Sequence, residues 1–109
     1  FNVIGNSPLV LRESLLDEVY TMGENFVEAA KRVVSPGMNG PFCIEGVYDE
    51  NAKFTSFEFS ARIVAGTNIY MDGSPYYSLL FNENMSMGKR IAREIKIAEE
   101  KNEIEKIVT

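Results

Sequence analysis

Two apolar segments on either side of a short polar loop constrain the fold of this chain more than any other feature. FCIEGVY (42–48) and FTSFEFSAR (54–62) flank the loop DENAK (49–53). Apolar and polar residues alternate along much of both segments, which is the period of a half-buried strand. A polar loop of this length suits a turn between adjacent strands. The pattern therefore predicts an antiparallel hairpin.

A hairpin that folds symmetrically about residues 51 and 52 has a defined register. On the apolar face, the predicted pairs are Phe42 with Ala61, Ile44 with Phe59, and Gly46 with Phe57; on the polar face, they are Cys43 with Ser60, Glu45 with Glu58, and Val47 with Ser56. A slip by one residue would put carboxylates among the phenylalanines and is disfavoured. A slip by two makes the glutamates diagonal neighbours. In either permitted register, both carboxylates lie close together on one surface.

Helical periodicity appears on both sides of the hairpin. The first apolar stripe recurs in steps of three and four residues and comprises Leu15, Val19, Met22, Phe26, Ala30 and Val33. Residues 35–37 (SPG) should end this helix. A last helix should start near Ser86, a favourable N-cap, and continue into a solvated, charged helical tail.

The other segments carry weaker signals. Residues 1–8 are expected to form a short strand followed by a turn. Residues 63–81 are expected to be irregular, with a short strand at 63–65 or 68–71 and a tight turn at 72–75. The order of helix, hairpin, irregular segment and helix predicts an α+β fold.

Composition excludes several classes of function. The net charge of −5 argues against a nucleic-acid surface, and no apolar run is long enough to span a bilayer. The single cysteine, Cys43, fits a reducing cytoplasm. Because the chain has no histidine, any catalysis must use other polar side chains or a bound metal. Since the 109 residues begin at Phe1, we expect a processed chain or an excised piece.

The two glutamates of the hairpin are the main candidate site. Like charges directly opposite on a sheet are destabilising. Two carboxylates this close either share a proton or hold a cation between them, and Mg²⁺ commonly binds one or two carboxylates together with substrate phosphates. The alternative is that Glu45 and Glu58 face open water and repel weakly. The apolar residues on both sides of each glutamate favour the metal site.

At the level of motifs, CIEGVYDENAKFTSFEFSAR is similar to the metal-binding hairpin of ATP-grasp ligases. In that hairpin, an acidic residue is followed across the turn by Glu-x-Asn and then Arg. The matching residues here are Glu45, Glu58 and Arg62, with Ser60 where Asn is usual. The longer strings SPGMNGPFCIEG, FEFSARIVAGTNIYMDGSPYYSLLF and MSMGKRIAREIK resemble the C-terminal part of the archaeal formate-dependent 5-formaminoimidazole-4-carboxamide ribonucleotide synthetases. The resemblance covers nearly the whole chain.

This resemblance implies a fold and a reaction. Residues 1–109 would form the C-terminal part of an ATP-grasp domain, with the N-terminal and adenine-clamping domains outside this chain. Formate, ATP and 5-aminoimidazole-4-carboxamide ribonucleotide would give the formylated nucleotide, ADP and phosphate by way of formyl phosphate. Glu45 and Glu58 would coordinate Mg²⁺ or Mn²⁺ at the ATP phosphates, and Asn6 and Arg62 would bind substrate. No protein nucleophile would be needed.

Each of these roles has an alternative. Arg62 could only balance the charge of the glutamates, and Asn6 could only form a turn. The parent protein could be another ATP-grasp carboxylate–amine ligase, or a non-catalytic interaction module with an exposed aromatic patch at residues 76–81. Tyr76, Tyr77 and Phe81 are more often core or subunit-interface residues, so the sequence is also compatible with a homo-oligomer.

Overall fold

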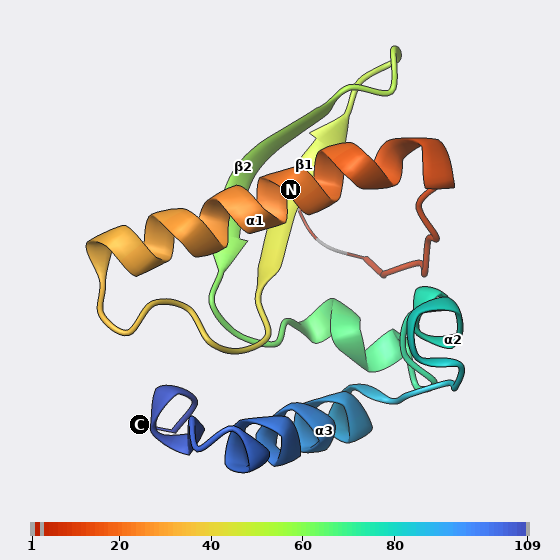
Figure 1. Ribbon diagram of the computed structural model, residues 1–109. Coiled ribbons are helices and arrows are strands. Elements are labelled where there is room, and N and C mark those ends of the chain that lie inside the picture. The colour runs from red at the N-terminus through yellow and green to blue at the C-terminus, as the bar shows by residue number, and fades with distance from the viewer. Residues whose placement is uncertain (1, 3, 109) are drawn as a thin grey trace. The chain divides into compact units, whose positions relative to one another are not determined.

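The structure is a computed structural model that describes residue 2 and residues 4–108 (Figure 1). The chain divides into two compact units. One unit is Leu11–Ile63; the other combines Phe1–Val10 with Val64–Thr109. Helices and one two-stranded antiparallel sheet make up the regular structure of the described residues, so the predicted α+β class is confirmed.

The unit Leu11–Ile63 contains one long helix and the hairpin. Helix α1 spans Leu16–Val33, after a single 3₁₀ turn at Glu13–Leu15. Acidic residues occupy its first turn and basic residues its last turn, which complements the helix dipole. The helix ends where Val34 becomes extended, two residues before Pro36. The predicted first helix is therefore confirmed.

The hairpin consists of strand β1 (Cys43–Tyr48) and strand β2 (Phe54–Ser60). Figure 1 shows α1 crossing one face of these strands. The ring centroids of Phe26 and Phe59 are 5.0 Å apart, so α1 packs on the face that carries Phe59. Gly23 lies where α1 meets Phe42: a Cβ on Gly23 would be 3.7 Å from the Phe42 ring. The predicted apolar face is thus the face that packs against the helix.

A bulge divides the hairpin. At the end of the hairpin away from the loop, the pairs are Cys43 with Ser60, Ile44 with Phe59, and Glu45 with Glu58, as predicted. Beyond that point the pairs are Gly46 with Ser56, Val47 with Thr55, and Tyr48 with Phe54. The predicted pairs Gly46–Phe57 and Val47–Ser56 are therefore wrong, because Phe57 is an extra residue without a partner in β1. The predicted strand 54–62 also ends early, at Ser60.

The other unit differs more from the sequence-based expectations. No strand is present in the described part of residues 1–8; residues 1 and 3 of this predicted strand lie outside the described residues. Residues Ala65–Ile69 form a 3₁₀ helix, so the predicted short strand there is wrong as well. The Tyr70 hydroxyl accepts a hydrogen bond from the Leu9 amide (3.0 Å) and donates one to the Leu9 carbonyl (3.1 Å). These two bonds hold the N-terminal segment to residue 70.

A short helix, α2 (Tyr76–Phe81), was not predicted. Its apolar sequence is too short to show a helical period. The turn before it ends at Gly73, whose amide donates to the Tyr70 carbonyl (3.0 Å) and whose φ is +77°. This φ lies in the left-handed region, which favours glycine.

Helix α3 spans Met87–Glu100 and starts where the sequence predicts. The Ser86 hydroxyl accepts a hydrogen bond from the Lys89 amide (3.2 Å), which is an N-cap. The predicted helical tail is wrong, because the helix stops at Glu100. Asn102 adopts a left-handed conformation (φ 56°), and the Glu103 amide bonds back to the Ala98 carbonyl at 2.8 Å. This is the Schellman motif, which commonly ends helices.

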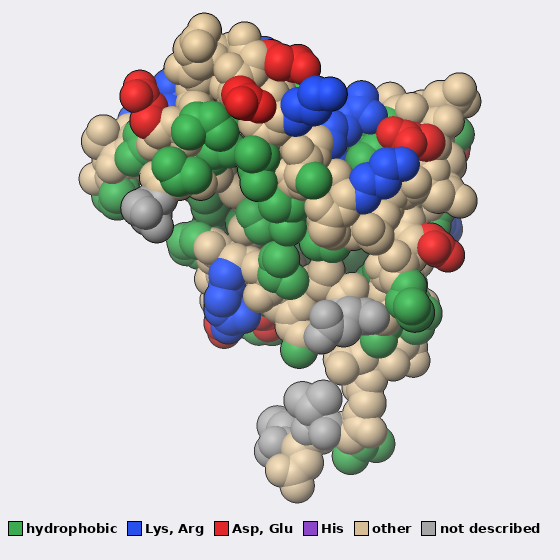
Figure 2. All heavy atoms as spheres, turned by 90° about the horizontal axis from the view of Figure 1, so that it is seen from below, with side chains coloured by type: hydrophobic (Ala, Val, Ile, Leu, Met, Phe, Trp, Pro, Cys, Tyr) green, Lys and Arg blue, Asp and Glu red, His purple; other side chains and the backbone are tan. Residues whose placement is uncertain are grey.

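Little of the described chain is deeply buried. Met85 is 1% exposed and Ala98 is 8% exposed. On the face seen in Figure 2, hydrophobic side chains reach the surface beside interspersed acidic and basic ones. Leu79 and Leu80 are among the exposed hydrophobic residues, whereas Tyr76, Tyr77 and Phe81 are half-buried.

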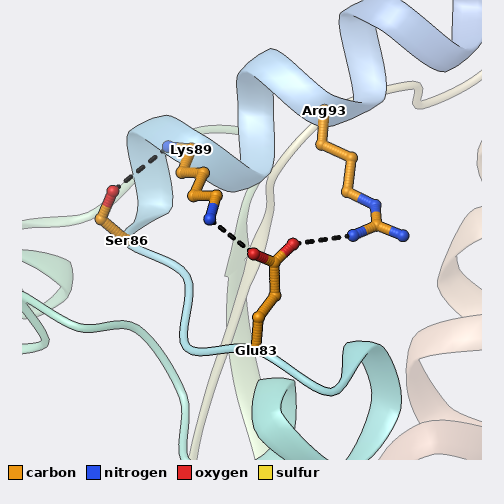
Figure 3. A network of polar contacts seen from close by, with 4 residues as sticks. All are labelled: Glu83, Ser86, Lys89 and Arg93. Carbon is orange, nitrogen blue, oxygen red and sulfur yellow. Dashed lines mark hydrogen bonds and ion pairs between the residues drawn. The ribbon is translucent and has the colours of Figure 1, made fainter.

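Glu83 ties the segment before α3 to the helix itself (Figure 3). Its carboxylate accepts hydrogen bonds from Lys89 Nζ (2.6 Å) and Arg93 Nη1 (3.2 Å). The guanidinium of Arg93 also lies 4.6 Å from the centroid of the Phe81 ring, a cation–π geometry. The hydrogen bond from Lys89 lowers the pKa of Glu83 below the usual 4.5, helped by the charges of Lys89 and Arg93.

This network predicts a pH-dependent contribution to stability. Because the folded pKa of Glu83 is depressed, its contribution is present above the unfolded pKa and is lost as the pH falls through the folded value. Urea unfolding between pH 6 and 3 should therefore show a smaller acid-induced loss of stability in Glu83→Gln than in the parent. Glu99→Gln, at an exposed position of α3, is the control. An identical pH dependence in Glu83→Gln and the parent would contradict the prediction.

Candidate divalent-ion site

The structure brings Glu45 and Glu58 together on one face of the hairpin. They occupy directly paired positions on β1 and β2, where side chains on the same face are neighbours. Adjacent residues in a strand point to opposite faces. Since Phe59 packs on α1, Glu58 lies on the face away from α1. The predicted pairing of these two glutamates is confirmed; their role as metal ligands stays a prediction.

The residue Cys43 lies two positions before Glu45 on β1. Burial raises the pKa of the Cys43 thiol, and the charge of Glu45 raises it further. The positive charge of Arg62 lowers it, and Glu58 raises it. Both carboxylates and the guanidinium therefore contribute to the electric field at Cys43. With a raised pKa the thiol stays protonated at neutral pH, so Cys43 is not an activated nucleophile.

Arg62 lies beyond the end of β2, in a bend, and its side chain is exposed. Its Nη1 donates a hydrogen bond to the Ile63 carbonyl (3.1 Å). The predicted strand 54–62 would have put Arg62 on the same face as Ser60; this prediction is wrong, because β2 stops two residues before Arg62. Of the predicted alternatives, an ion pair with Glu45 or Glu58 is absent from the salt bridges among the described residues.

Asn6 is exposed and belongs to the unit that contains Phe1–Val10. Glu45, Glu58 and Arg62 belong to the other unit. The structure therefore pairs Glu45 with Glu58 and leaves the roles of Arg62 and Asn6 as predictions.

The metal-site hypothesis predicts that both carboxylates face a cleft rather than bulk solvent, but the two differ in exposure. Glu45 is half-buried, but Glu58 is exposed. The apolar groove found in this unit is lined by residues of α1 and by Phe42, on the opposite side of the hairpin; they are Tyr20, Gly23, Glu24, Val27, Glu28 and Phe42. The carboxylates thus lie on an accessible outer face, which a large phosphate ligand could approach.

The donor set suits a hard divalent cation that shares its ligands with a substrate. The paired positions of Glu45 and Glu58 put two carboxylates on one face of the hairpin, and the Ser60 position follows on the same face. Within the described part of the chain there is no cluster of three or more His, Cys, Asp or Glu side chains that could enclose a metal. Mg²⁺ is often held by one or two carboxylates, with phosphate and water completing its shell. The residues therefore fit such an ion.

The prediction from sequence missed the bulge that accompanies this site. A signal for it was present: Phe54 and Phe59 are separated by five positions, an odd number, so a regular strand would point them to opposite faces. Their pairing with Tyr48 and Ile44, four residues apart in β1, puts both on the same face. The out-of-phase phenylalanine was therefore the sign of an extra residue.

Fold and site together define an α+β chain in which two glutamates occupy paired positions on adjacent strands of a hairpin. The whole chain, residues 1–109, matches the family described as "Domain of unknown function (DUF1297)". The chain belongs to this family. Among the described helices, none has the length and apolar character needed to cross a membrane.

Several named proteins are similar to the chain. It is 85% identical over 109 residues to the "5-formaminoimidazole-4-carboxamide-1-(beta)-D-ribofuranosyl 5'-monophosphate synthetase" of Nitrosopumilus maritimus and 72% identical to the protein of the same name from Cenarchaeum symbiosum. In each case the match covers 100% of this chain and 32% of the relative. The chain therefore spans about a third of the length of these relatives.

A solved structure shares the fold. The crystal structure titled "IMP biosynthesis protein PurP from Thermococcus kodakaraensis" matches with a TM-score of 0.80 and 37% sequence identity, over 96% of this chain and 34% of that one. These matches confirm the resemblance that the sequence motifs indicate.

Proposed function

We propose that this chain is part of an ATP-dependent ligase of purine biosynthesis. The ligase would join formate to the amine of 5-aminoimidazole-4-carboxamide ribonucleotide and release ADP and phosphate. The relatives carry the name of a synthetase for the corresponding formylated nucleotide, and the fold matches a protein titled as acting in IMP biosynthesis. Residues 1–109 would supply the C-terminal part of the ATP-grasp domain. The single observation that carries the proposal within the structure is the pairing of Glu45 with Glu58.

The chain's own residues would bind and orient the substrates. Glu45 and Glu58 would hold Mg²⁺ or Mn²⁺, with the Ser60 hydroxyl nearby. When bound, the ion would neutralise phosphate charge and help to orient the γ-phosphoryl group for transfer. Arg62 is exposed two residues beyond the end of β2, and it would make charge-assisted bonds to a phosphoryl or acyl phosphate group.

The remaining roles follow from the chemistry. No protein nucleophile is required, because formate and the nucleotide amine supply the attacking atoms. Asn6 would contact the nucleotide, since an amide both donates and accepts hydrogen bonds, as a carboxamide or ribose requires. The half-buried state of Tyr76, Tyr77 and Phe81 does not match the exposed aromatic patch expected of a non-catalytic interaction module. The single free cysteine supports a cytoplasmic location.

Product analysis of the full-length protein tests this function. Incubation with ATP, Mg²⁺, ¹³C-formate and 5-aminoimidazole-4-carboxamide ribonucleotide should yield the ¹³C-formylated nucleotide by mass spectrometry, with one ADP per product. Omission of any substrate, or chelation of the metal with EDTA, should abolish product. Acetate or another small acid in place of formate tests the alternative of a different carboxylate–amine ligase. Product formed preferentially from another acid, or no nucleotide product at all, would refute the proposal.

A further inference from the structure

The hairpin holds Glu58 opposite Glu45 only because of where its bulge lies. On the loop side, the paired residue numbers are 46 with 56, 47 with 55 and 48 with 54. If this register continued without a bulge, Glu45 would pair with Phe57, and Ile44 would pair with Glu58. Glu58 would then lie on the face that packs against α1. The extra residue Phe57, placed directly after the Gly46–Ser56 pair, restores the carboxylate pair.

Gly46 borders this bulge, and the absence of its side chain is a structural requirement. A Cβ at this position would overlap the Phe54 Cζ, and it would lie 2.7 Å from Phe54 Cε2. It would also lie 2.6 Å from the Thr55 carbonyl oxygen. The ring could rotate away, but the Thr55 oxygen belongs to the backbone of the paired strand. Any larger residue at position 46 must therefore push β2 away from β1 next to the bulge.

Two aromatic residues, Tyr48 and Phe54, contact each other on the loop side of Gly46, and the Phe54 ring lies against Gly46. The rings of Tyr48 and Phe54 lie 5.0 Å apart between their centroids. The loop beyond them is held by two hydrogen bonds to Asp49 Oδ1, from the amides of Asn51 and Lys53 (2.9 Å each). These contacts hold the loop end of the hairpin in place. A displacement of the strands at Gly46 would therefore affect the bulge and Glu58 on the other side.

We propose that Gly46 is a positioning residue for the divalent-ion site: without a side chain, it lets the strands close in the register that puts the bulge at Phe57 and Glu58 opposite Glu45. This inference rests on the proposed ion-binding role of the two glutamates. Gly46 itself contributes no ligand. A methyl group at position 46 changes the relative position of the two carboxylates without removing either of them.

Metal binding by the full-length protein tests the inference. The affinity for Mn²⁺ in the presence of ATP can be measured from the EPR signal of free Mn²⁺. Changes outside the ligands themselves typically weaken a metal site about 10- to 100-fold, and we expect Gly46→Ala to weaken Mn²⁺ binding by at least about tenfold. Gly40→Ala is the matched control, because a Cβ there meets nothing within 4 Å. It should bind Mn²⁺ like the parent.

A second measurement reports the register without using the metal. Cys43 lies directly opposite Ser60, and Cα atoms at paired positions are about 4.5–5.5 Å apart, which a disulfide can bridge. In a Ser60→Cys background, glutathione disulfide should link Cys43 to the introduced thiol, with reduced glutathione released. Mass spectrometry of the linked peptides follows the rate. Adding Gly46→Ala should slow this linkage several-fold, whereas Gly40→Ala should not.

The outcomes separate the inference from the proposed function. The positioning role of Gly46 is refuted if Gly46→Ala leaves two quantities unchanged: the affinity for Mn²⁺, and the rate of disulfide formation by Cys43 in the Ser60→Cys background. A different result is that Gly46→Ala slows disulfide formation but Glu45→Gln leaves the Mn²⁺ affinity unchanged. The ion site itself is then refuted, and with it the positioning role of Gly46.

Should Gly46→Ala not fold, the same change is made in a Phe54→Leu background. The overlapping ring is then gone, but the Thr55 oxygen remains. Equal Mn²⁺ affinities with and without Gly46→Ala in that background refute the inference.

Discussion

Glu58→Gln should abolish formate- and ATP-dependent turnover in the full-length protein and leave its fold intact. Glutamine keeps the shape of the side chain but removes the negative charge that a hard cation requires. Outer-shell partners of a metal typically affect activity or affinity by about 10- to 100-fold, so loss of a direct ligand should cost at least about 100-fold in turnover. Glu58 is exposed, so the substitution should change the thermal unfolding temperature little.

The matched control is Glu50→Gln, in the exposed loop of the same hairpin. It makes the same change in charge a few residues away, and it should keep nearly full turnover. If Glu58→Gln acts by weakening Mg²⁺ binding, a higher Mg²⁺ concentration should restore part of its activity. Parental turnover with an unchanged Mg²⁺ dependence would remove Glu58 from the mechanism.

Gly73→Ala should strongly destabilise the unit that contains α2 and α3. The φ of Gly73 is +77°, and a non-glycine residue in the left-handed region costs about 1–2 kcal/mol. A Cβ would also overlap the backbone oxygen of Met85 and lie 2.8 Å from Tyr77 Cδ2. Overpacking adds roughly 1–3 kcal/mol. Because Met85 is 1% exposed, its backbone has little room to withdraw.

The expected loss is therefore about 2–5 kcal/mol in the free energy of unfolding, measured by urea denaturation. Gly66→Ala is the control, since a Cβ there meets nothing within 4 Å. Hydrogen exchange of the α3 amides would show whether the loss is local to this unit. A stability equal to that of Gly66→Ala would show that the close approach of residues 73 and 85 is dispensable.

Local signals predicted those parts of the fold that short-range chemistry determines. The first helix follows from its apolar stripe and from the SPG sequence after it, and the start of α3 follows from the capping side chain of Ser86. The outer pairs of the hairpin follow because apolar residues must share one face. The elements that the sequence misplaced depend on the backbone conformation of single residues. Asn102 adopts a left-handed conformation and ends α3, and Gly73, also left-handed, precedes α2 in a segment expected to be irregular.

The candidate site shows the same division. The sequence by itself determined which residues carry its charge, because only two glutamates alternate with apolar residues along facing strands. It also determined the family resemblance, which the whole-chain match confirms. The spacing of Phe54 and Phe59 indicates an extra residue in β2, but tertiary structure alone placed it at Phe57 and ended the strand before Arg62. The physical reason is that strand pairing is a contact between two backbones: the Phe54 ring and the Thr55 oxygen must both fit against Gly46, and no periodicity within one strand encodes that fit.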